Sequence, residues 1–65
     1  MKARQIKLGM VVVIAGINGP DMVVAEFQGG SGDHLFRCVW FDVNEQLQTS
    51  WFDAEILERA DGGDQ

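Results

Sequence analysis

Cys38 and His34 are the side chains of this 65-residue chain that could pair a nucleophile with a base. Nucleophilic or acid/base catalysis needs such groups close together, with pKa values tuned to the reaction. The two residues stand four positions apart where a loop is expected to enter a strand, and Cys38 shares its predicted face with Phe36 and Trp40. A thiol among apolar rings is inert, so we expect Cys38 to be a core residue. We predict no catalytic residue and no enzyme activity.

Metal and phosphate sites are also disfavoured. One His and one Cys fall short of the roughly three or four ligands that zinc requires, and the acidic residues are scattered singly rather than grouped in a calcium loop. The glycine cluster Gly29 to Gly32 leads into a predicted strand, whereas phosphate-binding loops lead into a helix. We therefore expect a hairpin loop there, with no metal and no cofactor.

Two adjacent aromatic pairs, Trp40-Phe41 and Trp51-Phe52, are the most informative signal. Neighbours in a strand point to opposite faces, so one member of each pair should face the core and the other should face outward. Exposed Trp and Phe clusters commonly mark interfaces, which makes all four residues candidate partner-binding residues. Arg37, in the middle of the third apolar block, could pair with an acidic neighbour or anchor such an interface. The alternative is that local loops cover the outward rings within a monomer.

Four apolar blocks separated by turn residues indicate consecutive short strands, in a chain whose apolar content is 46%. Pro20 cannot donate a ladder hydrogen bond, so the second strand should begin after it. The third strand has two largely apolar faces, as expected for a strand covered on both sides or exposing one face to a partner. The fourth strand alternates polar with apolar residues and has a wet face. The expected strands cover 10–14, 21–27, 35–42 and 46–51.

The end of the chain predicts a single helical turn and a closing strand. Asp53 is placed to cap the turn through Ala54, and Ile56 and Leu57 then return apolar side chains to the core. About five short antiparallel strands with one helical turn before the last describe an all-β, small SH3-like barrel. The alternative is a two-turn helix from Asp53 to Ala60 packed on a smaller sheet. The expected organisation is a basic leader over 1–7, one barrel domain over 8–59 and a flexible acidic tail over 60–65.

Charge is unevenly distributed along the chain. The net charge is −5, and from Leu8 onward two basic residues stand against ten acidic ones. Nucleic-acid binding draws most of its affinity from cations placed on phosphates, so general DNA or RNA binding is disfavoured. The lone Cys38 allows no internal disulfide, and the apolar run Met10 to Ile14 is too short for a signal peptide or a membrane span. These features predict a cytoplasmic protein without membrane insertion.

A series of short motifs runs along residues 7–57 in a recognisable order. That order is Gly9 before a Val-rich strand, Gly19-Pro20-Asp21-Met22, Cys38-Val39-Trp40-Phe41-Asp42, Phe52 and Leu57. It resembles the YodC-like family of small uncharacterised bacterial and phage proteins. The chain departs from the family at Met10, where an acidic residue is usual, and in the longer first turn Ala15 to Gly19. The resemblance implies a compact barrel-like fold and brings no established activity, because the family is a domain of unknown function.

We expect a non-catalytic interaction or assembly module that docks a protein partner or itself through the aromatic residues. A chain this short buries a modest share of its surface, which favours oligomers, and its acidity favours basic partners. The alternative is a nucleic-acid-related role, as a ribosome-type barrel or an acidic phage decoy of a DNA-binding protein. An enzymatic role ranks third. Plasmid-type dihydrofolate reductases have a similar small barrel and a closing segment like Leu57-Glu58-Arg59, but in place of their Val-Gln-Ile-Tyr motif the nearest segment is Leu47-Gln48-Thr49-Ser50.

Overall fold

The computed structural model describes residues 3–17, 19–29 and 34–60 of the chain. It confirms the all-β fold, with five antiparallel strands in one sheet. No helix within these residues is long and apolar enough to cross a membrane. In chain order the elements are η1 (Ala3–Gln5), β1 (Val11–Ile14), β2 (Met22–Gly29), β3 (His34–Phe41), β4 (Leu47–Asp53), η2 (Ala54–Ile56) and β5 (Leu57–Arg59).

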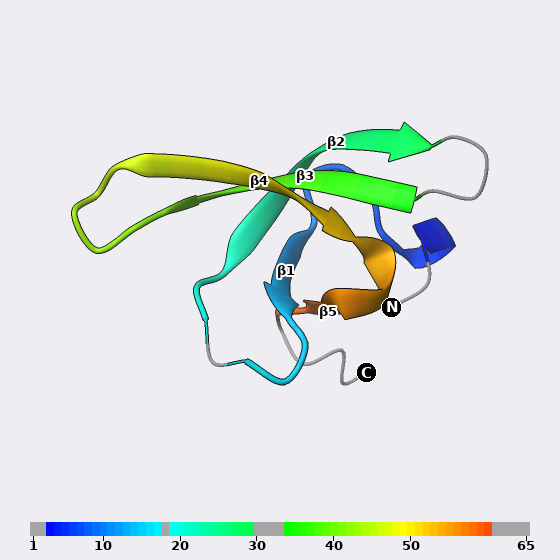
Figure 1. The fold of residues 1–65 in the computed structure, drawn as a ribbon, viewed down its shortest axis with the longest axis horizontal. Helices are drawn as coiled ribbons and strands as arrows, with labels where there is room; N and C mark the ends of the chain where they lie inside the picture. The colour runs from blue at the N-terminus through cyan, green and yellow to red at the C-terminus, as the bar shows by residue number, and fades with distance from the viewer. Residues whose placement is uncertain (1–2, 18, 30–33, 61–65) are drawn as a thin grey trace.

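The sheet has the strand order β4-β3-β2-β1-β5 and is open. Its edges are β4 and β5, which follow one another in the chain but do not pair within the described residues. In Figure 1 the long β3–β4 hairpin extends to the left, whereas β1 and β5 lie below the other end of the sheet. The described residues therefore form a curved antiparallel sheet, and the expected barrel closure is not found in them.

Every strand predicted from the sequence is present, but the ends differ. The second strand continues to Gly29 instead of ending at Phe27, and the fourth continues to Asp53 instead of ending at Trp51. These extensions lengthen the two hairpins that flank β3. The expected glycine-rich loop falls largely on residues 30–33 and the expected acidic tail on 61–65, both outside the described residues.

The turn between β4 and β5 is the short one that Asp53 predicts. The Asp53 carboxylate accepts the backbone N–H of Glu55 at 2.9 Å, which satisfies a donor at the start of η2. Leu57 is already extended, with φ −101° and ψ 145°, and its N–H donates to the carbonyl of Ala54. The alternative of a two-turn helix from Asp53 to Ala60 is therefore wrong.

Asp42 organises the turn at the end of the β3–β4 hairpin. Its Oδ1 accepts the backbone N–H groups of Asn44 at 2.8 Å and of Gln46 at 3.0 Å, and its Oδ2 accepts the Nε2 of Gln48 at 2.8 Å. Glu45 takes the left-handed conformation, with φ 61°, which lets the chain reverse in so few residues. The carboxylate of Asp42 thus accepts backbone N–H groups that would bond to backbone carbonyls in a tighter turn.

The core lies on one face of the curved sheet, and it includes a residue from the basic leader. Ile6 is only 6% exposed, so a residue of the segment expected as a basic leader over 1–7 contributes to the core. Met10, Ile14, Trp40 and Phe52 pack around the buried set as half-buried side chains. The buried residues are Ile6, Val12, Met22, Val24, Phe36, Cys38, Ala54 and Leu57.

A bulge in β2 decides which of its side chains meet the core. Val24 pairs with Cys38 and Glu26 with Arg37, so Ala25 is the extra residue between two consecutive positions of β3. Without it, Glu26 would share the core face with Val24. The bulge instead places Glu26 on the outer face beside Arg37 and returns Phe27 to the inner face opposite Phe36.

Candidate interaction face

Two of the three large apolar side chains of β4, those of Leu47 and Trp51, point away from the core, whereas Phe52 packs against it. Ser50 pairs with Cys38, which is fully buried, whereas Thr49 pairs with Val39 on the opposite face of β3. Because directly opposed residues share a face of the sheet, the polar Gln48 and Ser50 lie on the core side. Leu47 and Trp51 consequently face outward. A strand that only completed a core would show the reverse pattern.

The outward-facing residues of β2, β3 and β4 form a largely apolar surface that is interrupted by Glu26, Arg37 and Thr49; its apolar residues together with Arg37 are here called the hairpin face. Phe41 pairs with Leu47 at the end of the hairpin, and the side chains of the two residues are 67% and 61% exposed. Trp51, further along β4, is 42% exposed. Isolated exposed apolar residues need no explanation, but a connected row across neighbouring strands is typical of an interface. The hairpin face comprises Val23, Arg37, Val39, Phe41, Leu47 and Trp51.

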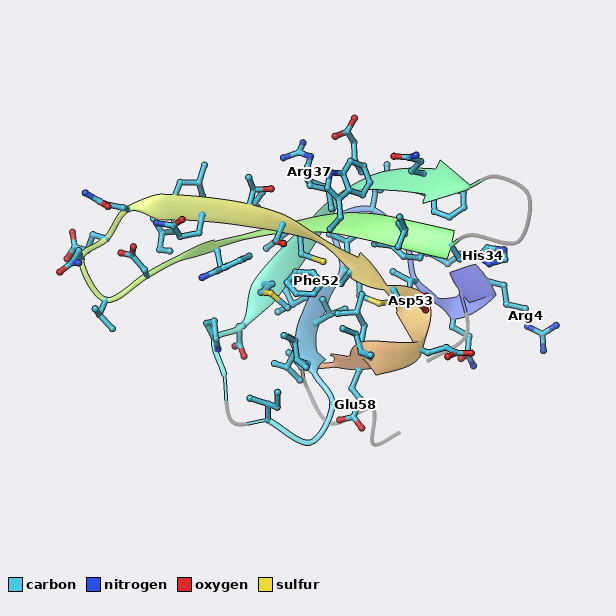
Figure 2. All side chains as sticks on the ribbon, viewed as in Figure 1. Arg4, His34, Arg37, Phe52, Asp53 and Glu58 are labelled. Carbon is cyan, nitrogen blue, oxygen red and sulfur yellow. The ribbon has the colours of Figure 1, made fainter. Side chains whose placement is uncertain are left out.

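The two aromatic pairs divide between the faces as the sequence predicts. Trp40 and Phe52 lie on the inner face, half-buried against the core, with ring centroids 6.1 Å apart. Figure 2 shows Phe52 beneath the sheet and Arg37 above it. Phe41 and Trp51 are the outward members. They are 67% and 42% exposed, whereas Trp40 and Phe52 are half-buried. Trp40 and Phe52 therefore contribute to packing within the protomer, and Phe41 and Trp51 are the exposed aromatic candidates for partner binding.

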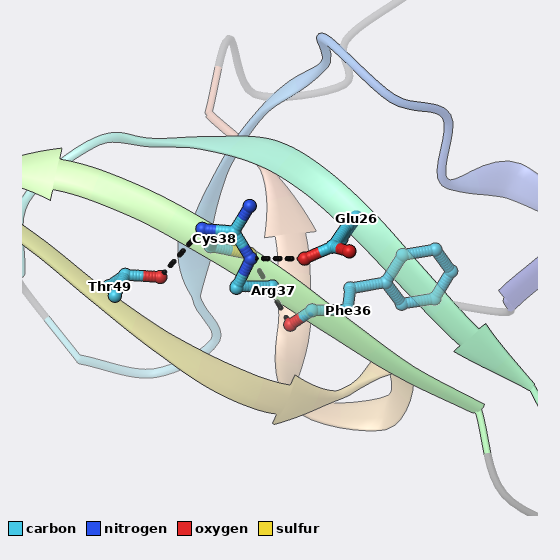
Figure 3. A network of polar contacts seen from close by, with 5 residues as sticks. All are labelled: Glu26, Phe36, Arg37, Cys38 and Thr49. Atoms are coloured by element: carbon cyan, nitrogen blue, oxygen red, sulfur yellow. Dashed lines mark hydrogen bonds and ion pairs between the residues drawn. The ribbon is translucent and has the colours of Figure 1, made fainter.

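Arg37 links three strands at the middle of the hairpin face (Figure 3). Its Nε donates to Oε1 of Glu26 at 2.5 Å, and its Nη1 donates to Oγ1 of Thr49 at 3.2 Å. The side chains of Arg37 and Glu26 are 32% and 57% exposed, so solvent screens the ion pair and its contribution to stability is small. Its effect is geometric: together with the Thr49 contact it fixes the position of the guanidinium on the outer face, on the residue that pairs with Trp51 across the strands.

The structure does not bring the candidate catalytic pair together. His34 is exposed at the start of β3 and Cys38 is buried four residues later on the same strand, a spacing of roughly 13 Å in an extended chain. Burial raises the pKa of the Cys38 thiol, which keeps it protonated, as expected for a core residue. In the described part of the chain, no three His, Cys, Asp or Glu side chains lie where they could share a metal ion.

A second apolar cluster, at the other end of the β2–β3 hairpin, escaped the sequence reasoning. The ring of Phe27 lies 4.9 Å from that of Phe36 and stacks at 6.4 Å on that of His34. Gly29 makes room for it, since a Cβ there would stand 2.6 Å from the Phe27 ring. The signal available in the sequence was an aromatic two residues before a strand glycine, because rings often cover glycines in sheets. A groove of about 490 Å³ is lined by Arg4, Ile6, Leu8, Phe27, His34 and Phe36.

Comparison with known proteins adds no relative. No protein-family model matches the chain, and no significant match is found among curated proteins or among solved structures. The resemblance to the YodC-like family accordingly stays an expectation from the motifs. The function must be argued from the geometry of this chain.

Proposed function

We propose that the protein is a non-catalytic interaction module that docks a protein partner through the hairpin face. Phe41 and Trp51 act as apolar anchors, and Arg37 lies between the strands as a polar contact that fixes orientation. Large aromatic side chains together with Arg are the residue types that dominate binding energy at protein interfaces. These residues lie on three neighbouring strands of a hydrogen-bonded sheet. Because the backbone there is already ordered, it loses little further conformational freedom on binding.

The observation that carries this proposal is the inverted pattern of β4. Leu47 and Trp51 lie on the face of β4 opposite the core and are 61% and 42% exposed. Burying apolar surface contributes about 25 cal/mol for each Å², so covering the exposed rings of Phe41 and Trp51 would stabilise a complex substantially. Two polar residues, Gln48 and Ser50, occupy the core-side positions instead. The strand is better suited to an outer partner than to its own interior.

Charge supports a basic partner. The chain has a net charge of −5, and Glu45 and Asp53 flank the apolar part of β4 on either side. Arg37, the cation on the hairpin face, is already paired with Glu26. A partner with an apolar patch bordered by Lys or Arg would meet complementary charge at the rim, which raises association rates and excludes acidic competitors.

We also propose that the curved sheet is the framework of an SH3-like barrel of the YodC-like kind, in a cytoplasmic protein. The support is topological. The chain passes directly from one sheet edge, β4, through η2 to the other edge, β5, and β5 then pairs with β1. This connection brings the C-terminal end of β4 near β5, as closure of a small barrel requires, whereas the hairpin end of β4 extends away from β5 (Figure 1).

The test is capture of partners from the host followed by binding with purified components. Tagged wild type, Trp51→Ser and Val43→Ser are compared. Val43 is 96% exposed in the hairpin turn and lies outside the hairpin face, so it controls for loss of an exposed apolar side chain. We expect a partner whose purified form binds wild type and Val43→Ser alike. Trp51→Ser should raise its Kd by at least about tenfold.

Salt and folding controls complete the experiment. Circular dichroism must show that Trp51→Ser is folded, which its outward position favours. Raising the salt from about 0.05 M to about 0.5 M should weaken binding of a basic partner. The proposal is wrong if every purified partner binds Trp51→Ser as tightly as wild type. If the captured partner is a DNA-binding protein, and if both added salt and Trp51→Ser weaken its binding, the interaction is that of an acidic decoy.

A further inference from the structure

The free edge of β4 is a docking element distinct from the hairpin face. β4 is terminal in the sheet, and its register with β3 runs without a shift from Leu47 to Asp53. Edge strands are usually protected from pairing by charged residues, proline or bulges. Residues 46–52 contain no charged residue and no proline. The described structure therefore presents a strand edge without these protective features.

The hydrogen-bonding alternation shows which backbone groups this edge offers. The N–H of Asp42 donates to the carbonyl of Gln46 at 3.0 Å, which marks the inward-bonding position at the end of the hairpin. In an antiparallel pair such positions alternate, so Gln48 and Ser50 bond to β3. The N–H and C=O groups of Leu47, Thr49 and Trp51 are then directed to the free edge. These are the residues whose side chains face outward.

We propose that two copies of this chain pair antiparallel along β4 about a two-fold axis at Thr49. Each Leu47 then lies opposite Trp51 of the second copy, and the two Thr49 side chains meet at the axis. Aromatic–aliphatic and Thr–Thr pairs are favourable cross-strand neighbours. The interface is isologous, which is the commonest symmetry of protein dimers.

The uncharged, self-complementary sequence of β4 argues for a second copy as the occupant. Two chains that each carry −5 repel one another over most of their surfaces, and β4 from Leu47 to Phe52 is a segment where they can meet without opposing charges. The stated register sets Glu45 of each copy opposite Asp53 of the other, so the like charges stand at the two ends of the paired segment and outside the Leu47–Trp51 pairs. A register moved by two residues would place Leu47 opposite Asp53 and lose both apolar pairs.

Pairing would also double the hairpin face. The outer faces of the two β4 strands become neighbours in one continuous six-stranded surface, so Trp51 of each copy lies beside Leu47 of the other. The dimer is measured by the mass of the free protein and partner binding by the Kd for the partner, so the two proposals can fail separately although both use Trp51.

Sedimentation equilibrium on wild type, Thr49→Lys and Gln28→Lys tests the dimer. Thr49→Lys sets two like charges opposite each other at the axis, and Gln28→Lys adds the same charge at an exposed position on β2. Wild type and Gln28→Lys are expected to dimerise with the same Kd, and Thr49→Lys to raise it by about tenfold or more. A wild type that is monomeric at every concentration measured overturns the dimer. So does a Thr49→Lys that dimerises as wild type does.

Disulfide trapping tests the register with substitutions at exposed positions of β4, which are expected to leave the protein folded. Directly opposed residues of a hydrogen-bonded pair have Cα atoms about 5.5 Å apart, within disulfide range. Thr49→Cys should crosslink two copies under mild oxidation faster than Ser50→Cys, whose side chain is directed to the inner face. The native Cys38 is buried and should not react. Faster crosslinking through position 50 would overturn the stated register.

Discussion

Asp42 concentrates more hydrogen bonds on its side chain than any other residue whose contacts are described above. The backbone N–H of Gln46 has the largest effect in lowering the pKa of this carboxyl below its ordinary value of 3.8, followed by the side chain of Gln48. These donors favour the charged form. The aromatic anchors of the hairpin face depend on this contact indirectly, because Phe41 and Leu47 flank the turn that Asp42 holds.

The first prediction follows from that pKa. Since the folded-state pKa of Asp42 lies below the unfolded-state value, its contribution to stability is fully present above the unfolded value and is lost as the pH falls through the folded value. Urea midpoints measured from neutral pH down to about pH 2 should therefore fall for wild type. Asp42→Asn should show a shallower fall over this range.

The control for Asp42 is Asp21→Asn, an exposed acid outside the turn. Its urea midpoint should fall between neutral and acid pH by about as much as that of wild type. If the midpoint of Asp42→Asn also falls as far as that of wild type, the role assigned to Asp42 in the turn is contradicted. The comparison uses differences between two pH values, so a uniform loss of stability in either variant does not affect it.

At the scale of elements, the aromatic alternation and the Asp53 turn were predictable because both are local. Two neighbours in a strand must point to opposite faces, which fixed that Trp40 and Phe41 would separate, as would Trp51 and Phe52. An Asp before a short helical turn satisfies an N–H that lies two residues ahead. Neither conclusion requires knowledge of which strands pair.

The orientation of β4 and the Phe27 cluster could not be predicted because they depend on pairing. Alternation gives two faces but does not say which one meets the core, and the register with Cys38 decides it. The bulge at Ala25 reverses the faces within β2, and nothing in the sequence marks it. Ile6 reaches the core from a segment whose charge predicted an exposed leader. Barrel closure likewise depends on contacts between distant strands.

The second prediction concerns the connection between the sheet edges. Asp53→Ala removes the acceptor for the N–H of Glu55 and should lower the free energy of unfolding by about 1 kcal/mol, the usual effect of losing an N-cap. Asp53→Asn keeps an acceptor oxygen and should retain most of the stability. Urea unfolding followed by circular dichroism measures both. Equal stability of Asp53→Ala and wild type would show that η2 needs no cap.

At the scale of the whole molecule, only one of the two faces of the sheet is packed against a core. Within the described residues, one face of the sheet packs around eight buried residues, and the opposite face of β2, β3 and β4 lies in solvent. The described elements η1, η2 and β5 are each three residues long, too short to cover that face. The exposed rings are thus a consequence of size combined with a two-sided apolar strand.

The third prediction compares two phenylalanines, one on each side of this sheet. Phe41→Ser removes an outward ring and should change the free energy of unfolding by no more than about 0.5 kcal/mol. Phe52→Ser removes a ring packed against the core and should cost about 2 kcal/mol or more. Thermal and urea unfolding at low protein concentration, where association does not contribute, measure the two changes. If Phe41→Ser destabilises the fold as much as Phe52→Ser, the outer ring supports the protomer itself, and the reason to assign the hairpin face to a partner disappears.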